Sequence, residues 1–337
     1  MSSFIFFAIL HFVMFTVSAQ RPNATVALDG TGDYRSIVEA VGHIPNNSDS
    51  FFYIYVKAGV YNENVFIGGE KRNIVMSGDG IGKTIIVSSL SNSSNSGIGV
   101  SAALNIESEF FLAKDMSILN SAGPEGGQAV ALRTSGDHIA CLRCSIEGFQ
   151  DTLYAHQGKS QFFYNCDIYG TIDFIFGDAA VIIQNSTIHV RLPLHGQQNV
   201  ITADGRHLSD SNTAIVIHNC SIVPTPDLRS QSDVKTYLGR PWKKFSQTII
   251  MQSYLDTFID REGWMKFDES SDVTTLHYVE FRNSGPGSST SGRVKWPGYH
   301  VLNNPKDVQN FTVEKFINGS EWLPKLDVPY SSGLVST

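Results

Sequence analysis

Short strand-like units recur through the middle of this 337-residue chain, and they constrain its fold more than any other feature. Each unit alternates apolar and polar residues and is followed by Gly, Asn or Asp. Successive units are 28, 22, 20, 34 and 33 residues apart, measured between their central residues Ile118, Ile146, Ile168, Ile188, Ile222 and Leu255. Helical periodicity is almost absent, apart from a short helix predicted near residues 34–44. The sequence therefore predicts an all-β solenoid, the parallel β-helix, in which each coil completes the core of its neighbour; a sandwich or a propeller is the alternative.

Composition agrees with a β-rich protein that has tight turns and a sizeable core. Hydrophobic residues make up 42% of the chain and charged residues only 17%, and there are 29 glycines. The net charge is −7 and no basic run occurs, so nucleic acid is not expected as a partner.

The N-terminal residues 1–19 are predicted to be a secretory signal peptide. An apolar stretch from Phe4 to Val17 precedes the small residues of a cleavage site, and it is short for a membrane-spanning helix. No later segment approaches 18 apolar residues, so we expect a secreted protein with no membrane span, in which residues 20–337 form a single domain. Seven N-glycosylation sequons fit this expectation, at Asn23, Asn46, Asn92, Asn185, Asn219, Asn310 and Asn318.

Four cysteines do not form a paired CxxC zinc pattern, so no metal site is expected. Cys144 and Cys166 are 22 residues apart, which would place them one coil apart. They could form a disulfide or stack as buried thiols, and we favour the thiols. Cys220 is predicted to be buried and free.

The same interval of 22 residues separates Asp151 from Asp173 and Gln128 from Gln150. If one coil here has 22 residues, each pair lies side by side, about 4.8 Å apart. Two carboxylates at about 5 Å repel by about 3 kcal/mol at an effective dielectric constant of about 20, so the pair should retain one proton near neutral pH. Arg240 is the candidate cation that keeps one of them ionised. The alternative is that both aspartates are turn residues without chemistry.

Around these residues the sequence resembles the plant pectin methylesterases, from residues 29–41 to residues 322–334. The matching motifs, in order, are GVYNENV (59–65), GQAVALR (127–133), GFQDTLY (148–154), DFIFG (173–177) and LGRPW (238–242). The resemblance implies a right-handed parallel β-helix of the single-stranded pectin-lyase type. It also implies an enzyme that demethylates pectin, without an inhibitor-like pro-domain between the signal peptide and the catalytic domain.

Residue by residue, the resemblance implies that Asp173 is the nucleophile that forms an acyl-enzyme. Asp151 would be the general acid for methanol and then the general base for water. Gln150, with Gln128, would donate to the oxyanion, and Arg240 would hold Asp173.

The resemblance also implies a sugar-binding groove for methyl-esterified homogalacturonan. Gln128 and Arg240 would contact this substrate, and four aromatic residues would line the groove unless they fill the core: Trp242, Trp264, Phe174 and Tyr154. Strict strand alternation would place Asp173 on the face of Ile175, opposite Phe174 and Phe176. No cofactor is expected, the protein should act as a monomer in the cell wall, and a proteinaceous inhibitor is a plausible partner.

Two departures from the family pattern stand out. Ile98 occupies the place of a substrate-contacting threonine, so that contact is not carried over, and Phe267 lies near the place of a second tryptophan. Two other functions remain open: another β-helix enzyme, such as a lyase or hydrolase acting on polygalacturonate, and a binding protein without activity.

Overall fold

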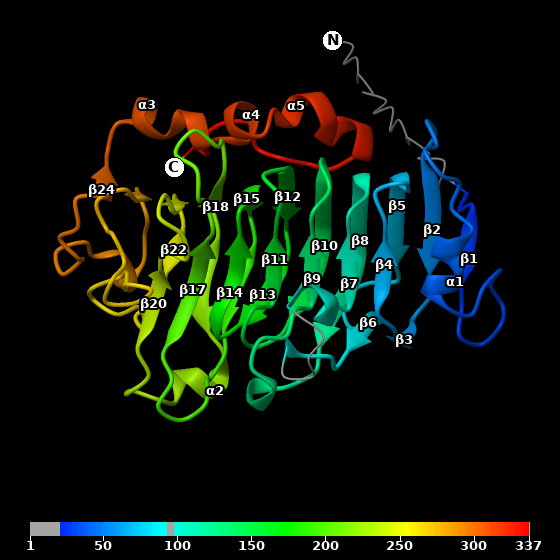
Figure 1. The fold of residues 1–337 in the computed structure, drawn as a ribbon, viewed down its shortest axis with the longest axis horizontal. Helices are drawn as coiled ribbons and strands as arrows, with labels where there is room; N and C mark the ends of the chain where they lie inside the picture. Colours follow the sequence, from blue (N-terminus) through cyan, green and yellow to red (C-terminus); the bar gives the residue numbers. More distant parts are fainter. Residues whose placement is uncertain (1–20, 93–97, 337) are drawn as a thin grey trace, which may run out of the picture.

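A computed structural model describes residues 21–92 and 98–336 of the chain, and the predicted signal peptide, residues 1–19, lies outside them. Its strands stack side by side along a common axis, which runs horizontally in Figure 1. Strands of successive coils pair in parallel. The predicted parallel β-helix is therefore confirmed, and a sandwich or propeller is excluded. Within the described ranges, no helix has the length and apolar character needed to cross a membrane.

Three parallel sheets form the sides of this helix, and we number them 1 to 3 in the order in which a coil visits them. Sheet 1 contains β1 (Ala24–Val26), β2 (Phe52–Val56), β5 (Arg72–Gly78), β8 (Glu109–Asn120), β10 (Ile139–Glu147), β12 (Ser160–Tyr164), β15 (Ala180–Gln184), β18 (Ala214–His218), β21 (Gln247–Met251), β23 (His277–Phe281) and β24 (Tyr299–Leu302). Sheet 2 contains β3 (Gly59–Asn62), β6 (Thr84–Ser88), the second halves of β8 and β10, β13 (Asp167–Gly170), β16 (Thr187–Val190), β19 (Ser221–Pro224) and β22 (Tyr254–Leu255). Sheet 3 contains β4 (Val65–Ile67), β7 (Leu104–Ile106), β9 (Leu132–Thr134), β11 (Leu153–Ala155), β14 (Ile172–Gly177), β17 (Asn199–Asp204) and β20 (Thr236–Gly239).

The corner between sheets 1 and 2 explains the recurring sequence unit. Seven residues, from seven successive coils, turn the chain there with a left-handed backbone, at φ between 48° and 58°: Asp115, Arg143, Asn165, Asn185, Asn219, Gln252 and Arg282. We call these residues the corner ladder. The first six lie at the same spacings as the units, because each precedes the central residue of its unit by the same number of positions. Asn and Asp tolerate this backbone best, and neighbouring coils support each other, as where Asn219 Nδ2 donates to Asn185 Oδ1 at 2.6 Å.

Apolar side chains from all three sheets fill the interior of the helix. The predicted short helix is confirmed as α1 (Ile37–Gly42), which packs Ile37, Ala40 and Val41 into this core at its N-terminal end. The hydroxyl of Ser36 caps α1 by accepting from the amide of Glu39 at 3.0 Å.

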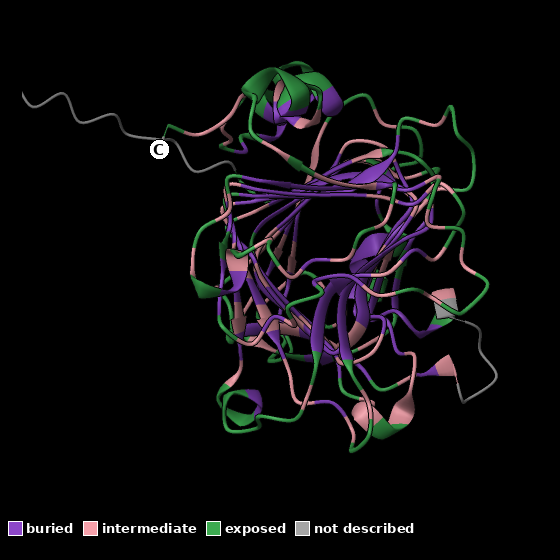
Figure 2. Ribbon diagram, turned by 90° about the vertical axis from the view of Figure 1, so that its left-hand side faces the viewer, coloured by how far each residue is buried: buried purple, intermediate pink, exposed green. Residues whose placement is uncertain are grey.

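The C-terminal segment covers the outer face of sheet 1 (Figure 2). Residues such as Phe316, Trp322 and Leu323 pack there against Phe162 and Ile182 of the sheet.

The remaining helices and 3-10 turns are α2 (Pro226–Arg229), α3 (Pro305–Val308), α4 (Val313–Phe316), α5 (Gly319–Trp322), η2 (Ile98–Ser101), η3 (Pro124–Gly126), η4 (Pro286–Ser288), η5 (Gln309–Phe311) and η6 (Leu323–Leu326). The outer face of sheet 3 has a smaller apolar cluster of Ala102, Val130, Phe176 and Ala203, with Tyr154 and Trp242 packed against it.

The four cysteines, Cys141, Cys144, Cys166 and Cys220, are free and buried. The prediction of stacked thiols is therefore confirmed. Burial raises the pKa of the Cys220 thiol to about 12, so this group stays protonated and acts as a small apolar side chain.

Candidate active site

Asp151 lies two residues before β11 and Asp173 lies within β14, in adjacent coils. These strands pair in the register Leu153↔Ile175, and the amide of Asp151 donates to the carbonyl of Ile172 at 3.0 Å. One coil thus has 22 residues here, as the sequence predicted, and the two carboxyl groups belong to the same edge of sheet 3. Both aspartates have a left-handed backbone, at φ 64° and 50°.

A bulge at Asp173 decides which face its side chain takes. β14 and β17 pair at Ile172↔Val200 and again at Ile175↔Thr202, so two residues of β14 oppose one residue of β17 between these points. The prediction from strict alternation is therefore wrong. Phe174 and Ile175 both pack in the interior, whereas Phe176 belongs to an outer cluster with Ala203 and Trp242. The bulge turns Asp173 out of the core, and this resolves how a charged residue fits into an apolar strand.

Arg240, which directly follows β20, forms a bidentate ion pair with the Asp173 carboxylate. Nε donates to Oδ1 at 2.8 Å, and an Nη donates to Oδ2 at 2.6 Å. The carbonyl of Thr202 fixes the Arg240 backbone by accepting its amide at 2.9 Å. The ring of Phe267 lies 4.5 Å from the guanidinium carbon and covers the other side of the cation. Since Asp173 is only 8% exposed, this ion pair is largely shielded from water.

Asp151 has a neutral partner instead of a cation. Gln128 Nε2 donates to Asp151 Oδ2 at 2.9 Å. Gln128 and Gln150 are paired by a parallel bridge, so the two amides are neighbours, as the interval of 22 residues predicted. Gln150 is half-buried and does not belong to the lining of the cavity described below.

The two aspartates consequently differ in acidity. Burial, followed by the charge of Asp173, raises the pKa of Asp151 to about 8, and Gln128 and Arg240 lower it only in part. Burial also raises the pKa of Asp173, but the hydrogen bonds and charge of Arg240 oppose this effect. The pair therefore holds its shared proton on Asp151 and leaves Asp173 ionised near neutral pH. Such a site offers an acid and a nucleophile side by side.

A small cavity of about 110 Å³ brings these groups together. Its lining residues are Gln128, Asp151, Asp173, Phe176, Ala203, Trp242 and Phe267. Trp242, which was predicted for the groove, does lie here. Tyr154 is half-buried beside the cavity and stacks on Phe176, with ring centroids 4.4 Å apart and planes 8° from parallel. An aromatic surface thus adjoins the carboxylates, and its ring faces suit packing against an apolar face of a ligand.

Two predicted groove residues are instead part of the core. Phe174 is fully buried because of the bulge, and Trp264 is 1% exposed. Trp264 pairs with Gly239 across sheet 3, where a side chain on Gly239 would collide with Thr202 and would crowd the Trp264 ring. Its ring packs against Tyr278, with centroids 4.4 Å apart and planes tilted by 34°, and its indole N–H donates to Glu280. The assignment of Phe174 and Trp264 to substrate binding is therefore wrong.

Sequence reasoning also overlooked Phe176 and gave Phe267 no role. The repeat could not reveal Phe176, because its outward direction depends on the bulge. Phe267 lies outside the named strands, where no register predicts its neighbours. For Ile98, the departure from the family pattern falls on a side chain outside the described part of the structure.

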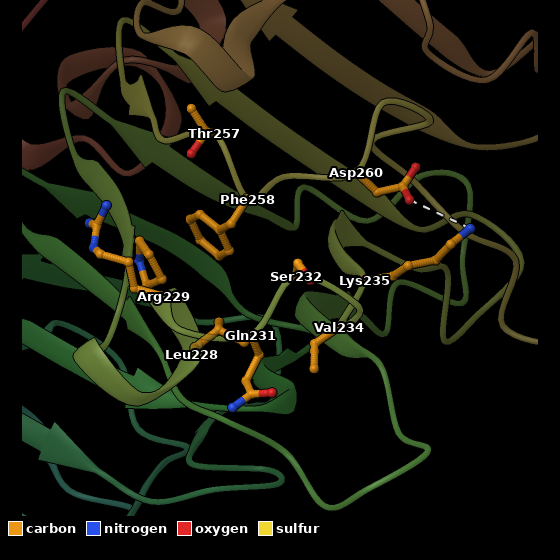
Figure 3. Close-up of a pocket in the computed structure, with 10 residues that line it drawn as sticks. Leu228, Arg229, Gln231, Ser232, Val234, Lys235, Thr257, Phe258 and Asp260 are labelled. Carbon is orange, nitrogen blue, oxygen red and sulfur yellow. Dashed lines mark ion pairs between the residues drawn. The ribbon is translucent and has the colours of Figure 1, made fainter.

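A larger cavity of about 340 Å³ lies beside α2 (Figure 3). Its charged side chains are already paired: Lys235 with Asp260 at 3.6 Å, and Arg229 with Asp256 at 2.9 Å. It shares no lining residue with the cavity at the aspartates. In the described ranges, no group of three or more His, Cys, Asp or Glu side chains could hold a metal ion.

Residues 23–320 match the protein family described as Pectinesterase. The chain belongs to the pectinesterase family. It is 48% identical over 315 residues to pectinesterase 2 of Citrus sinensis, covering 93% of this chain and 61% of the relative. It is also 48% identical over 310 residues to the probable pectinesterase/pectinesterase inhibitor 12 of Arabidopsis thaliana, covering 92% of this chain and 56% of the relative. The chain thus spans little more than half the length of these curated relatives.

Solved pectinesterase structures share the architecture. The pectin methylesterase from carrot superposes with a TM-score of 0.92 at 45% identity, covering 94% of this chain and 99% of that one. The pectin methylesterase from Aspergillus niger gives a TM-score of 0.76 at 28% identity, covering 91% and 97%. The fold of this pectinesterase-family chain is accordingly a right-handed parallel β-helix, as predicted.

Proposed function

We propose that this protein hydrolyses the C6 methyl esters of galacturonate units in pectin, releasing methanol and leaving pectate. One observation carries the proposal: Asp173, held by both arms of Arg240, lies one coil from Asp151, whose pKa is raised to about 8. Membership of the pectinesterase family supports the same reaction.

The first half-reaction uses the difference between the two aspartates. An ionised oxygen of Asp173 attacks the carbonyl carbon of the methyl ester and forms a tetrahedral oxyanion. Gln128, together with Gln150, donates hydrogen bonds to that oxyanion. As the intermediate collapses, the bond from carbon to the methoxy oxygen breaks. Asp151 gives its proton to the departing methanol, which leaves an acyl-enzyme, an anhydride of Asp173.

The second half-reaction reverses the role of Asp151. Its carboxylate now takes a proton from water, and the resulting hydroxide attacks the acyl carbon. The bond to Asp173 breaks, the sugar leaves as a free acid, and Asp151 is protonated again. Arg240 stabilises Asp173 as a carboxylate leaving group, so the nucleophile is regenerated in its ionised state.

The aromatic surface beside the cavity supports a polymeric sugar as the substrate. Trp242 lines the cavity, and Tyr154 and Phe176 stack next to it. Sugar rings present apolar C–H faces that pack on aromatic rings. We propose that methyl-esterified homogalacturonan binds across these three residues, with Gln128 and Arg240 at the reacting unit.

Methanol release from highly methylated pectin by the purified protein tests the function. We expect release without added calcium, and we expect Asp173→Ala and Asp151→Ala to abolish it while both variants remain folded, which circular dichroism checks. Appearance of unsaturated or shortened polygalacturonate in place of methanol would indicate the lyase or hydrolase alternative. Absence of any turnover would indicate the binding protein.

The remaining proposals concern the protein's setting. We propose that residues 1–19 direct secretion and that the enzyme acts as a monomer in the cell wall. A proteinaceous inhibitor is a proposed partner, supported by the names of relatives such as the probable pectinesterase/pectinesterase inhibitor 12.

A further inference from the structure

We propose that Asn92 is a positioning residue that holds the side-chain amide of Gln128 with its N–H group facing the catalytic cavity. The inference rests on the proposed esterase function, in which Gln128 must donate a hydrogen bond to the oxyanion. Asn92 lies outside the cavity lining and acts only through Gln128.

Asn92 holds Gln128 at two points. Its backbone amide donates to the Gln128 carbonyl at 2.9 Å, and its side-chain Nδ2 donates to Gln128 Oε1 at 3.0 Å. The first contact fixes the position of Gln128, and the second fixes the rotation of its amide. The contact joins residues 36 positions apart.

The rotation matters because the two ends of a glutamine amide are of similar size but opposite in hydrogen bonding. The oxygen only accepts, and the nitrogen donates two hydrogens. With Oε1 held by Asn92, Nε2 faces Asp151 and donates to its Oδ2 at 2.9 Å. The second hydrogen of Nε2 remains for the oxyanion. A reversed amide would present an oxygen to the developing negative charge and would oppose the reaction.

Substitutions at and near Asn92 distinguish its role in orienting the Gln128 amide from effects of side-chain size and of glycosylation. Asn92→Ala removes the side-chain donor and leaves the Gln128 amide free to rotate. Asn92→Asp keeps the shape but replaces the donor with an acceptor, so it favours the reversed amide. Because Asn92 begins an Asn-Ser-Ser sequon, Ser94→Ala is the matched control: it removes the sequon and keeps the Asn92 side chain.

We expect Asn92→Ala to lower kcat for methanol release about tenfold and Asn92→Asp about 100-fold, because loss of a whole oxyanion donor costs about 10²–10³-fold. KM should stay within about twofold, since the sugar-binding surface is untouched. Ser94→Ala should match the wild type. If Asn92→Ala does not fold, Asn92→Asp, which preserves the shape, still decides the question. An Asn92→Asp variant with wild-type kcat would overturn the inference, because Asn92 would then not be acting as a donor.

The double variant Asn92→Ala/Gln128→Ala distinguishes positioning from general stability. If Asn92 acts through Gln128, adding Asn92→Ala to Gln128→Ala should change kcat by less than about twofold. A further drop equal to that of the single variant would show that the two residues act independently and would overturn the inference. A wild-type protein that releases no methanol would instead refute the proposed function, and the inference with it.

Discussion

Two arginine–aspartate pairs in this protein have nearly the same contact geometry and opposite surroundings. Arg240 holds Asp173 on the outer face of sheet 3 through Nε–Oδ1 and Nη–Oδ2 contacts of 2.8 and 2.6 Å. Arg143 holds Asp115 at the corner ladder through the same two kinds of contact, at 2.6 and 2.7 Å. Both aspartates also have a left-handed backbone.

The difference lies in the solvent and in the neighbours. The side chains of Arg240 and Asp173 are 20% and 11% exposed, whereas those of Arg143 and Asp115 are 46% and 29% exposed. The first pair also has a second carboxyl group, Asp151, one coil away, which shares its cavity. At the corner, the two arginine nitrogens link two coils. At the cavity, the same contact holds the carboxylate that we propose as the nucleophile, so contact geometry alone does not identify a site.

The largest expected effect is a difference in activity between variants of Asp173 and variants of Asp115. Asp173→Asn should lower methanol release at least about 10³-fold because the amide is a far weaker nucleophile. Asp115→Asn should leave release within about twofold of the wild type. Asparagine tolerates the left-handed backbone at both positions, so both variants should keep their melting temperature within a few degrees. Equal activity of the two variants would break the comparison.

Replacing Arg240 or Arg143 should lower the free energy of unfolding by different amounts. Arg240→Met leaves Asp173 buried without its cation and should lower the free energy of unfolding by about 3 kcal/mol. Arg143→Met, at the exposed corner, should lower it by less than about 1 kcal/mol. Urea unfolding measures both values. Similar losses would mean that the cavity pair is as well solvated as the corner pair.

The pH dependence of stability should reveal the proton on Asp151. Its pKa is about 8 in the folded protein and about 3.9 in an unfolded chain, so the folded state binds this proton more tightly. The stabilisation from that proton is complete below the unfolded pKa and is lost as the pH rises to about 8. The melting temperature of Asp151→Asn, relative to the wild type, should therefore rise by a few degrees between pH 4 and pH 8 and level off above. A difference that is constant with pH would refute the raised pKa.

The smallest expected effect is that of salt on stability, and it should fall mainly on the exposed Arg143–Asp115 pair. The contribution of Arg143 to the unfolding free energy, of about 0.5 kcal/mol, should fall towards zero in 1 M NaCl because exposed charges are screened. The contribution of Arg240 should change less, since burial limits screening. Unfolding curves of both methionine variants at low and high salt measure this contrast.

The features that could be predicted from the sequence are those that depend on coil length. Counting 22 residues correctly placed Asp151 one coil before Asp173, because paired strands of adjacent coils keep a fixed register. The corner ladder produced the repeat that revealed the fold, because a left-handed residue recurs at this corner in seven successive coils.

Other features depend on local geometry that no count reveals. Phe174 turns inward because the bulge interrupts the alternation on which the prediction relied. Trp264 lies in the core because its pairing with Gly239 leaves room for a large ring. Asn92 reaches Gln128 from a segment outside the named strands, where no periodicity gives a register.

The unequal coils also indicate where new sequence could be added to this protein. Corner-ladder residues are 20 to 34 positions apart, yet adjacent strands remain in register, because the extra residues leave the stack as loops such as residues 191–198. Foreign peptides or affinity tags should be tolerated in that loop without disturbing the strands on either side. The coil from Asp151 to Asp173 allows no such freedom, since one added residue within its strands would turn one of these two carboxyl groups away from the cavity. Engineering of this scaffold should therefore alter its loops and leave that one interval untouched.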